Sequence, residues 1–338
     1  MSARIYSDFA SLHSALPRLR ETSCSRGSVF QTLPWFENLF AHGMDAVAPV
    51  LLADADGCLP LLDDGQSINA LSNYYSSLFG AAGALPKNMP LCLPRRAMIN
   101  LQPMDSAAAE FQQLKHELAA SGYWVDDYFC FGNWYLDVAG RSFNDYLSSR
   151  SSQLRSNIQR GKGKLAKAGN WQIVIHRHLG AELEQAIFAF EAVYALSWKN
   201  PEPHPDFIAN MCRMAATQGW LRLGVLALND KPVAAQIWLT YQGVANIYKL
   251  AYDEGAMRYS AGSVLTAAMM EHALDNDQVH EVDYLTGDEP YKQDWMSHRR
   301  ERRGIIAFDL TQWHGLLAAA RHWAGRCWHR IRSLQAPS

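Results

Sequence analysis

The sequence predicts a mixed α/β protein with a largely antiparallel sheet, and three observations lead to this prediction. Between residues 170 and 310, apolar residues alternate between strand-like and helix-like spacing. Three consecutive strand-like segments lie there at 220–228, 232–241 and 244–252, and the short turns Asn229-Asp230 and Gln242-Gly243 between them are typical of tight hairpins. A further hairpin is indicated near the N-terminus, where apolar runs at 47–53 and 58–62 flank the turn at 54–57.

The segment from 170 to 310 is expected to hold its elements in a definite order. A strand comes first, two helices follow, and the three hairpin strands come next. A helix, a strand, a short helix and a final strand complete the series. Outside the hairpin strands, the expected ranges are 172–177, 181–198, 206–217, 262–275, 279–285, 291–297 and 304–310.

The N-terminal region, 1–140, has a mixed pattern. Apolar spacing predicts a helix at 107–121, and Gly122 fits the position just past its end. A strand is expected at 134–138. The Gly-, Ala- and Pro-rich stretch 78–94 is expected to be a loop.

A basic connector is expected at 141–169. Apolar residues at helical intervals predict one helix over 142–168, whose middle Gly161 and Gly163 would weaken. No acidic residue follows Asp145 within it, while the basic residues are Arg150, Arg155, Arg160, Lys162, Lys164 and Lys167. We therefore divide the chain into an N-terminal half, a basic connector, a C-terminal domain and a C-terminal helix, at 1–140, 141–169, 170–310 and 311–338.

Composition narrows the classes of function. The 338 residues are 49% apolar and 19% charged, which is typical of a folded globular chain, and the net charge of −2 gives no global field toward nucleic acid or membrane. Six cysteines are scattered without a CxxC pair, which fits a reducing cytosol and argues against zinc or a disulfide framework. The alternating His176 and His178 have no evident third ligand, so we expect no metal. No signal peptide or membrane-spanning run is evident, and a cytoplasmic protein is expected.

The most informative stretch is 244–292. It predicts a strand, a Gly/Ser-bearing turn, an amphipathic helix, another strand and then a polar cluster. The first N–H groups of a helix are unpaired and carry a partial positive charge, so such a turn can hold a phosphate or pyrophosphate. Ser260 and Gly262 also fit an ordinary helix cap, which is the alternative interpretation.

At this point the residues resemble a known family. The stretch 282–295, VDYLTGDEPYKQDW, resembles the D-x-x-x-G-x-x-x-YK-x-x-W signature of the CelD-like acetyltransferases, which are GNAT relatives from bacterial cellulose and exopolysaccharide gene sets. Ser260-Ala261-Gly262 resembles the family's Ser-Pro-Gly, with alanine in place of proline. The stretch 154–160, LRSNIQR, resembles its basic helix, and the element order of 170–310 is similar to that of a GNAT domain. The family is similar to the Fem-type aminoacyl transferases, so the resemblance implies two GNAT-like halves.

The resemblance implies an N-acyltransferase that uses acetyl-CoA or another acyl-CoA as cosubstrate. It places the cosubstrate at the turn before the helix, at Tyr252, Arg258, Ser260, Ala261, Gly262 and Ser263. The implied acceptor is a small-molecule or glycan amine, related to the envelope or to exopolysaccharide. Transfer needs a deprotonated amine, a polarised carbonyl and a proton for the leaving thiolate.

Catalytic roles are expected in the polar cluster. Asp283 could take the amine proton, Tyr291 could protonate the thiolate, and Lys292 could hold an acceptor anion or neutralise an oxyanion. In the alternative interpretation Asp283 pairs with Lys292 and only fixes the loop, while Tyr291 is a packed ring. Substrate or phosphate contacts are expected at Lys249, Arg155, Trp198, Lys199 and Asp288.

Two segments leave the function open. The basic connector could bind the RNA of a Fem-like, aminoacyl-tRNA-dependent transferase, or it could be a solvated helix face; without interleaved aromatics, sequence-specific nucleic-acid binding is not expected. The tail at 312–334 predicts an amphipathic helix with an apolar stripe of Trp313, Leu316, Leu317, Ala320, Trp323, Ala324, Cys327, Trp328 and Ile331. This stripe either packs on the protein or contacts the inner face of the membrane as a peripheral anchor, and a non-catalytic assembly module at that surface is a third hypothesis.

Overall fold

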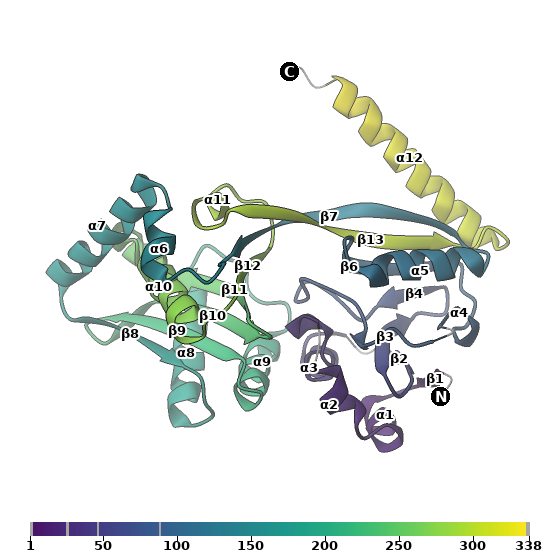
Figure 1. Cartoon of the computed structure of the whole chain (residues 1–338), viewed down its shortest axis with the longest axis horizontal. Helices are drawn as coiled ribbons and strands as arrows, with labels where there is room; N and C mark the ends of the chain where they lie inside the picture. The colour runs from purple at the N-terminus through teal and green to yellow at the C-terminus, as the bar shows by residue number, and fades with distance from the viewer. Residues whose placement is uncertain (1–2, 25–26, 46, 88, 336–338) are drawn as a thin grey trace. The chain divides into compact units, whose positions relative to one another are not determined.

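The computed structural model describes residues 3–24, 27–45, 47–87 and 89–335. The chain divides into two compact units. Unit 1 comprises Met1–Phe40, Met44–Cys130 and Glu301–Ser338, and unit 2 comprises Ala41–Gly43 and Phe131–Arg300. The long strands β7 (Trp124–Asp137) and β13 (His298–Phe308) each contribute residues to both units. Figure 1 shows the elements with their labels.

The sheet of unit 2 is mostly antiparallel, as predicted. Its strand order is the second part of β7, then β12, β11, β10, β9 and β8. The pairing of β11 with β12 is parallel and the other pairings are antiparallel. The bounds are Trp171–His176 for β8, Leu221–Leu228 for β9, Lys231–Tyr241 for β10, Val244–Tyr252 for β11 and Glu281–Thr286 for β12.

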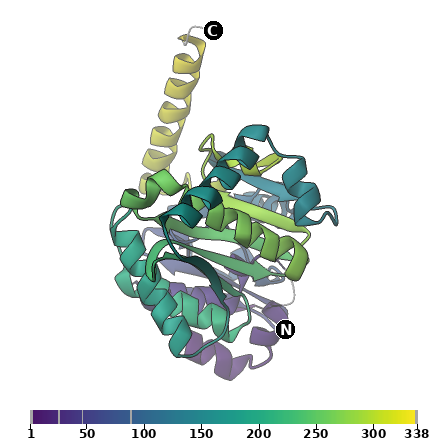
Figure 2. The same ribbon diagram turned by 90° about the vertical axis from the view of Figure 1, so that its left-hand side faces the viewer.

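Helices cover both faces of this sheet. In Figure 2, α8 (Ala181–Ala195) and α9 (Pro205–Thr217) lie on one side, and α7 (Ser152–Ala168) and α10 (Ala261–Glu271) lie on the other. The second side contains an apolar core to which α7, α10 and the sheet all contribute, for example through Ile158, Val264 and Trp238. Further short segments of the unit are η2 (Glu254–Tyr259), the π-helical turn η3 (His272–Asn276) and α11 (Lys292–Trp295).

The predicted single helix at 142–168 is wrong, because the structure has two helices there. The first, α6 (Phe143–Ser148), ends before α7 begins, and Ser151 starts α7 by accepting a hydrogen bond from Leu154 N at 3.1 Å. Gly161 is not simply a weak point, because a Cβ there would lie 2.8 Å from Tyr259 O and from a methyl of Val264. The glycine allows α7 to approach α10 closely, so the basic segment is packed within unit 2.

Other boundaries also differ from the predictions. The strand expected at 134–138 is the end of β7, which begins ten residues earlier, and the stretch 78–94 that was expected to be a loop contains a short strand and a short helix at Ala82–Gly83 and Met89–Cys92. The last strand, β13, begins six residues before the expected 304. The helix expected at 262–275 ends at Glu271, and η3 continues it to Asn276. The hairpins, the helix α5 (Ala109–Ala120) with a left-handed Gly122 after it, and the strands β8 to β11 are confirmed within one or two residues.

Unit 1 repeats the order of elements found in unit 2. Its sheet has the order β1, β2, β3, β4, β6 and the second part of β13, with β5 beside β3, and the pairing of β4 with β6 is parallel. The strands are β1 (Arg4–Tyr6), β2 (Pro49–Ala53), β3 (Gly57–Asp63), β4 (Ser67–Ala70), β5 (Ala82–Gly83) and β6 (Met98–Asp105). Its helices before α5 are α1 (Phe9–Ala15), α2 (Leu19–Ser23), η1 (Val29–Gln31), α3 (Leu33–His42) and α4 (Met89–Cys92).

Each series runs strand, helices, three antiparallel strands, helix, parallel strand, helix and last strand. The last strand of each series pairs within the other unit, because β7 hydrogen-bonds to β12 and β13 to β6. This shared order agrees with the prediction of two similar halves.

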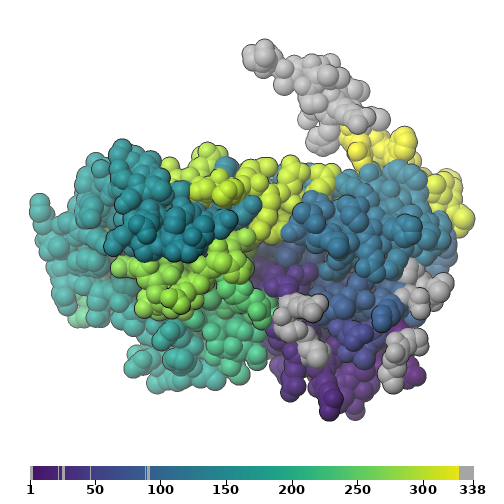
Figure 3. Space-filling view, viewed as in Figure 1, coloured from purple at the N-terminus to yellow at the C-terminus, as the bar shows by residue number. Residues whose placement is uncertain are grey.

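The C-terminal helix α12 (Trp313–Gln335) belongs to unit 1, and its side chains are described as far as Arg326. Its first turns lie against neighbouring residues of that unit (Figure 3), and His322 Nε2 lies 2.9 Å from Asp126 Oδ2. Large members of the predicted apolar stripe nevertheless remain exposed, namely Trp313 at 68%, Leu316, Leu317, and Trp323 at 57%. Cys327, Trp328 and Ile331 lie outside the described side chains.

Candidate functional site

Strands β11 and β12 separate partway along their length. They pair only through Val244–Asn246 opposite Glu281–Asp283, although β11 continues to Tyr252. Beyond Asp283 the backbone turns, with Leu285 in the left-handed region at φ 56°, and Thr286 pairs with Asn133 of β7. Among the described strands, β11 therefore has no partner on this side after Asn246. This splay leaves backbone polar groups of β11 available.

The N-terminus of α10 opens onto a hollow beside this splay. The hollow has a volume of about 190 Å³ and is lined by Tyr252, Met257, Ser260, Ala261, Gly262 and Ser263. Ser260 occupies the cap position in the left-handed region, but its side chain makes no capping hydrogen bond and its Oγ lies 3.0 Å from Asn157 Oδ1 instead. The first N–H groups of α10 are thus left without a side-chain cap, as an anion site requires.

Five of the six residues predicted to bind the cosubstrate meet at this hollow, and the sixth is placed differently. Arg258 is exposed, and its guanidinium lies over the Tyr259 ring at 4.7 Å and donates to the Tyr259 hydroxyl at 2.6 Å. Trp198, from the loop after α8, packs on Tyr252 with ring centroids 4.6 Å apart. The Tyr252 ring lies close to Gly262, since a Cβ added to Gly262 would be 3.2 Å from this ring.

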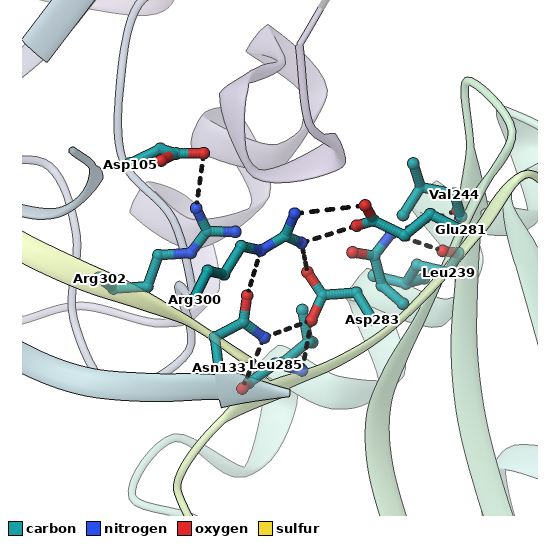
Figure 4. A network of polar contacts seen from close by, with 10 residues as sticks. Asp105, Asn133, Leu239, Val244, Glu281, Asp283, Leu285, Arg300 and Arg302 are labelled. Carbon is teal, nitrogen blue, oxygen red and sulfur yellow. Dashed lines mark hydrogen bonds and ion pairs between the residues drawn. The ribbon is translucent and has the colours of Figure 1, made fainter. Parts of the chain in front are cut away.

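Asp283 lies in a buried polar network on the other side of the splay (Figure 4). One carboxylate oxygen accepts hydrogen bonds from Asn133 Nδ2 at 2.5 Å and from Leu285 N at 2.7 Å, and the other accepts from Arg300 at 2.5 Å. Arg300 also pairs with Glu281 at 2.6 Å and donates to Asn133 Oδ1 at 2.7 Å. Both oxygens of Asp283 are therefore engaged, which is typical of a carboxylate that holds strands together.

The sequence patterns did not indicate Asn133, Glu281 or Arg300. A signal was available for Arg300, which is one of four arginines within 299–303, because such a density of charge in a strand requires partners.

Lys292 is also engaged by its own loop. Its ammonium donates to the carbonyls of Thr286 and Gly287, pairs with Glu289 at 2.9 Å and lies 5.3 Å from the centre of the Tyr284 ring. The side chain is buried, and these contacts close the loop that follows β12. Asp288 pairs with Arg299 at 2.7 Å, and the hydrogen bond from Arg299 holds the pKa of that carboxyl below its usual range.

Tyr291 is more accessible. Its ring is 45% exposed and meets the buried Tyr284 edge-on at 5.7 Å. Burial of the hydroxyl and the negative charge of Glu289 raise the pKa of Tyr291 to about 12, so the phenol is protonated at neutral pH. A protonated phenol in the loop that follows β12 can donate a hydrogen bond or a proton.

A second charged cluster lies on β11 and the loop between α8 and α9. Lys249 is buried on β11, and its ammonium pairs with Glu202 at 2.7 Å. Lys199, from the same loop, is half-buried over the rings of Tyr194 and Trp198, 5.7 Å from each ring centre. Burial lowers the pKa of Lys199 to about 8, and the nearby positive charge of Lys249 acts in the same direction.

The sequence indicated Lys249, Trp198 and Lys199, and the structure brings them together. It did not indicate Glu202, whose only signal was an acid within the proline-rich stretch PEPHP. Arg155 is not among this group: it is exposed on α7 and donates to Ser148 O at 2.7 Å. Within the described parts of the chain, no group of three or more His, Cys, Asp or Glu side chains is placed to hold a metal ion.

Comparison with protein families identifies the domain that carries this site. Residues 152–293 match the model of the acetyltransferase (GNAT) domain. No curated protein matches the sequence of this chain. The matched segment contains the splay, α10 and both charged clusters, except for Asn133 and Arg300. The chain is therefore an enzyme with a GNAT acyltransferase domain.

Solved structures share the fold of almost the whole chain at low sequence identity. FemX is 10% identical, with a TM-score of 0.59, and the match covers 90% of this chain and 97% of that one. The C-terminal DUF2156 domain of a protein from Agrobacterium fabrum, provisionally described as a lysylphosphatidylglycerol synthetase, is 13% identical with a TM-score of 0.56, covering 90% and 94%. A conserved protein of unknown function from Bacteroides thetaiotaomicron is 9% identical with a TM-score of 0.59, covering 90% and 99%. At these identities the likeness concerns the fold.

In the described part of the chain, each helix is too short or too polar to cross a lipid bilayer.

Proposed function

We propose that this protein transfers an acyl group, in the simplest case acetyl, from acyl-CoA to a primary amine. The observation that carries the proposal is the uncapped N-terminus of α10, which opens onto the hollow beside the splay of β11 and β12. N–H groups at a helix start suit a pyrophosphate, and a splayed strand offers N–H groups to a thioester carbonyl. Ser260, Ala261, Gly262 and Ser263 would hold the pyrophosphate, and Tyr252 would flank the chain that follows it.

The proposed chemistry is a direct attack of the amine on the thioester carbon. The N–C bond forms, the C–S bond breaks, the nitrogen loses a proton and the thiolate gains one. Tyr291 is protonated at neutral pH and accessible, which supports its role as the proton donor to sulfur. The engagement of both Asp283 oxygens favours a positioning role for this residue, which would keep β12 apart from β11.

The acceptor is proposed to be an amine of the bacterial envelope or of an exopolysaccharide, as in the CelD-like acetyltransferases that 282–295 resembles. Two structural neighbours are FemX and a protein provisionally described as a lysylphosphatidylglycerol synthetase, and the second name refers to a lipid. The neighbours support an acceptor at the envelope only by analogy of fold.

The exposed stripe of α12 supports a peripheral contact with the inner face of the membrane through 312–334. No acidic residue follows Asp309, whereas Arg321, Arg326, Arg330 and Arg332 do, so the tail combines exposed tryptophans with positive charge. We expect the full chain to float with vesicles that contain about 30% phosphatidylglycerol and a variant ending at Thr311 not to float. Equal flotation of the two proteins would exclude this anchor.

A Fem-like reaction with aminoacyl-tRNA is the competing function. Arg155 and Arg160 are exposed on α7, and Asn157 of the same helix contacts Ser260 at the start of α10, which is compatible with an RNA backbone. Binding of tRNA that weakens steeply with salt, in a protein that does not bind CoA, would favour it.

The proposed function is tested by thermal melting with and without acetyl-CoA and longer acyl-CoAs. Ligand at a hundredfold over its dissociation constant should stabilise the protein by about 2.7 kcal/mol, which gives a measurable rise in Tm. The Gly262→Trp variant should lose this rise, because its side chain would occupy the hollow beside Tyr252. Gly163→Trp is the matched control, because no atom lies within 4 Å of a Cβ there. No rise with any acyl-CoA in the wild-type protein would overturn the proposal.

A further inference from the structure

The carboxylate of Glu202 is buried, and only one of its two oxygens accepts a hydrogen bond from the described residues. The side chain is only 10% exposed, and Oε1 accepts a hydrogen bond from Lys249 at 2.7 Å. Its other oxygen, Oε2, is buried and has no hydrogen-bond partner within the described residues. A buried acceptor without a partner is costly, and one that faces a functional region is commonly completed by a ligand.

The position of this oxygen relates it to the acyl-transfer site. Lys249, which holds Glu202, lies on β11 three residues after Asn246, where the pairing with β12 ends. The loop that contains Glu202 also contains Trp198, which packs on Tyr252 at the hollow. Two contacts therefore connect Glu202 and its loop to the segment of β11 that would flank the acyl group: the pair with Lys249, and the packing of Trp198 on Tyr252.

Two lysines lie near the same position. Lys249 is paired with Glu202, while the ion pairs of the described residues do not include Lys199. Lys199 interacts electrostatically with Lys249 and Glu202, so the three groups are near one another. A free carboxylate oxygen accepts from an ammonium or amine, and an unpaired lysine attracts an anion. Together they suit a molecule that carries both groups.

We infer that Glu202, Lys249 and Lys199 form the acceptor subsite, and that the acceptor is a primary amine bearing a carboxylate or phosphate. The amine would donate to Glu202 Oε2, and the anionic group would lie at Lys199. As the N–C bond forms and the C–S bond breaks, Glu202 takes the proton that leaves the nitrogen, and sulfur receives its proton from Tyr291. This inference rests on the proposed function and names its acceptor class and its base.

The acceptor class is tested with matched pairs of amines and acetyl-CoA, by following the release of thiol. β-Alanine is compared with propylamine, and phosphoethanolamine with ethanolamine, so that each pair differs in the anionic group. The anionic member should be used at least tenfold better in kcat/KM, and Lys199→Met should remove most of that preference. Whether β-alanine or phosphoethanolamine is the better acceptor then distinguishes a carboxylate from a phosphate. Equal use of charged and uncharged amines, or no use of either anionic amine, would overturn the assignment.

The role of Glu202 is tested with Glu202→Gln, which keeps the shape and can still accept from Lys249. We expect kcat to fall at least a hundredfold and the remaining activity to lose the wild-type rise with pH, because the proton acceptor is gone. The rise in Tm with acetyl-CoA should persist. Glu184→Gln is the matched control, since Glu184 is an exposed acid of α8 that pairs with Arg213 at 2.7 Å.

A purely structural role is excluded with a double variant, Glu202→Gln with Lys249→Met, which removes both charges of the buried pair. If Glu202 only supports the loop, the double variant should restore both the Tm and the turnover that Glu202→Gln loses. We expect it to restore the Tm alone. Unchanged kcat in Glu202→Gln, together with an intact Tm rise, would overturn the inference and leave the proposed function standing. A wild-type protein without a Tm rise would overturn both.

Discussion

Two polar regions flank the splay of β11 and β12, and they differ in how completely their groups are satisfied. On the β12 side, Asp283, Asn133 and Arg300 form a buried network in which both carboxylate oxygens of Asp283 are occupied. On the β11 side, the start of α10 is uncapped and Glu202 keeps a free buried oxygen. A polar network whose groups are all hydrogen-bonded stabilises the fold, whereas polar groups without a partner are available to bind a ligand. The residues on the β12 side therefore support the structure of the site, and those on the β11 side would bind its ligands.

The largest expected effect is on the satisfied side. Asp283→Asn removes the charge that faces Arg300 in a buried setting and should lower the free energy of unfolding by about 3 kcal/mol. Urea unfolding measures this loss. Turnover of the protein that remains folded should stay within about threefold, because the carboxylate is engaged by the network. Intact stability with a hundredfold fall in kcat would instead make Asp283 the base.

Unit 1 offers an intermediate case in Glu110 of α5. Its carboxylate accepts from Ala81 N at 2.7 Å, but burial raises its pKa to about 7. Because the folded pKa lies above the unfolded value, its contribution to stability is greatest below about pH 4.5 and falls as pH rises toward 7. Glu110→Gln should therefore stabilise the protein by about 2 kcal/mol at pH 8 and leave it unchanged at pH 4. Melting curves at the two pH values test this; an equal effect at both would show that ionisation is not involved.

The smallest effect concerns the wall of the hollow, where α7 meets α10. Gly161→Ala should destabilise by about 1 kcal/mol, because its Cβ would press on Tyr259 O at 2.8 Å. Gly163→Ala, two residues along the same helix, should stabilise by about 0.5–1 kcal/mol, since no atom lies within 4 Å. Denaturant midpoints of the two variants measure the difference. The opposite sign at Gly161 would mean that α7 does not approach α10 so closely.

Local patterns were sufficient for most of the fold. Hairpin turns and alternating apolar residues predicted the bounds of β9, β10 and β11 to within two residues, because successive side chains of a strand point to opposite faces of the sheet. Periodicity alone was wrong at 142–168, where Ser149 is the C-cap of α6 and Ser151 caps the start of α7. It also missed the start of β13, since charged side chains in 298–303 are neutralised by partners distant in sequence.

The sequence by itself determined the fold class, the order of elements and the glycine-bearing turn before α10, because these depend on periodicity and on residues near one another in the chain. Only the tertiary structure decided which polar groups are paired. Asp283 lies in the most distinctive motif of the chain, yet Asn133 and Arg300, which lie 150 residues before it and 17 after it, occupy its oxygens. The proline-rich stretch around Glu202 did not indicate its partner. The fold placed Glu202 against Lys249, 47 residues away, and left one of its oxygens without a hydrogen-bond partner among the described residues. Pairing depends on which distant groups share a buried space, and that follows from packing.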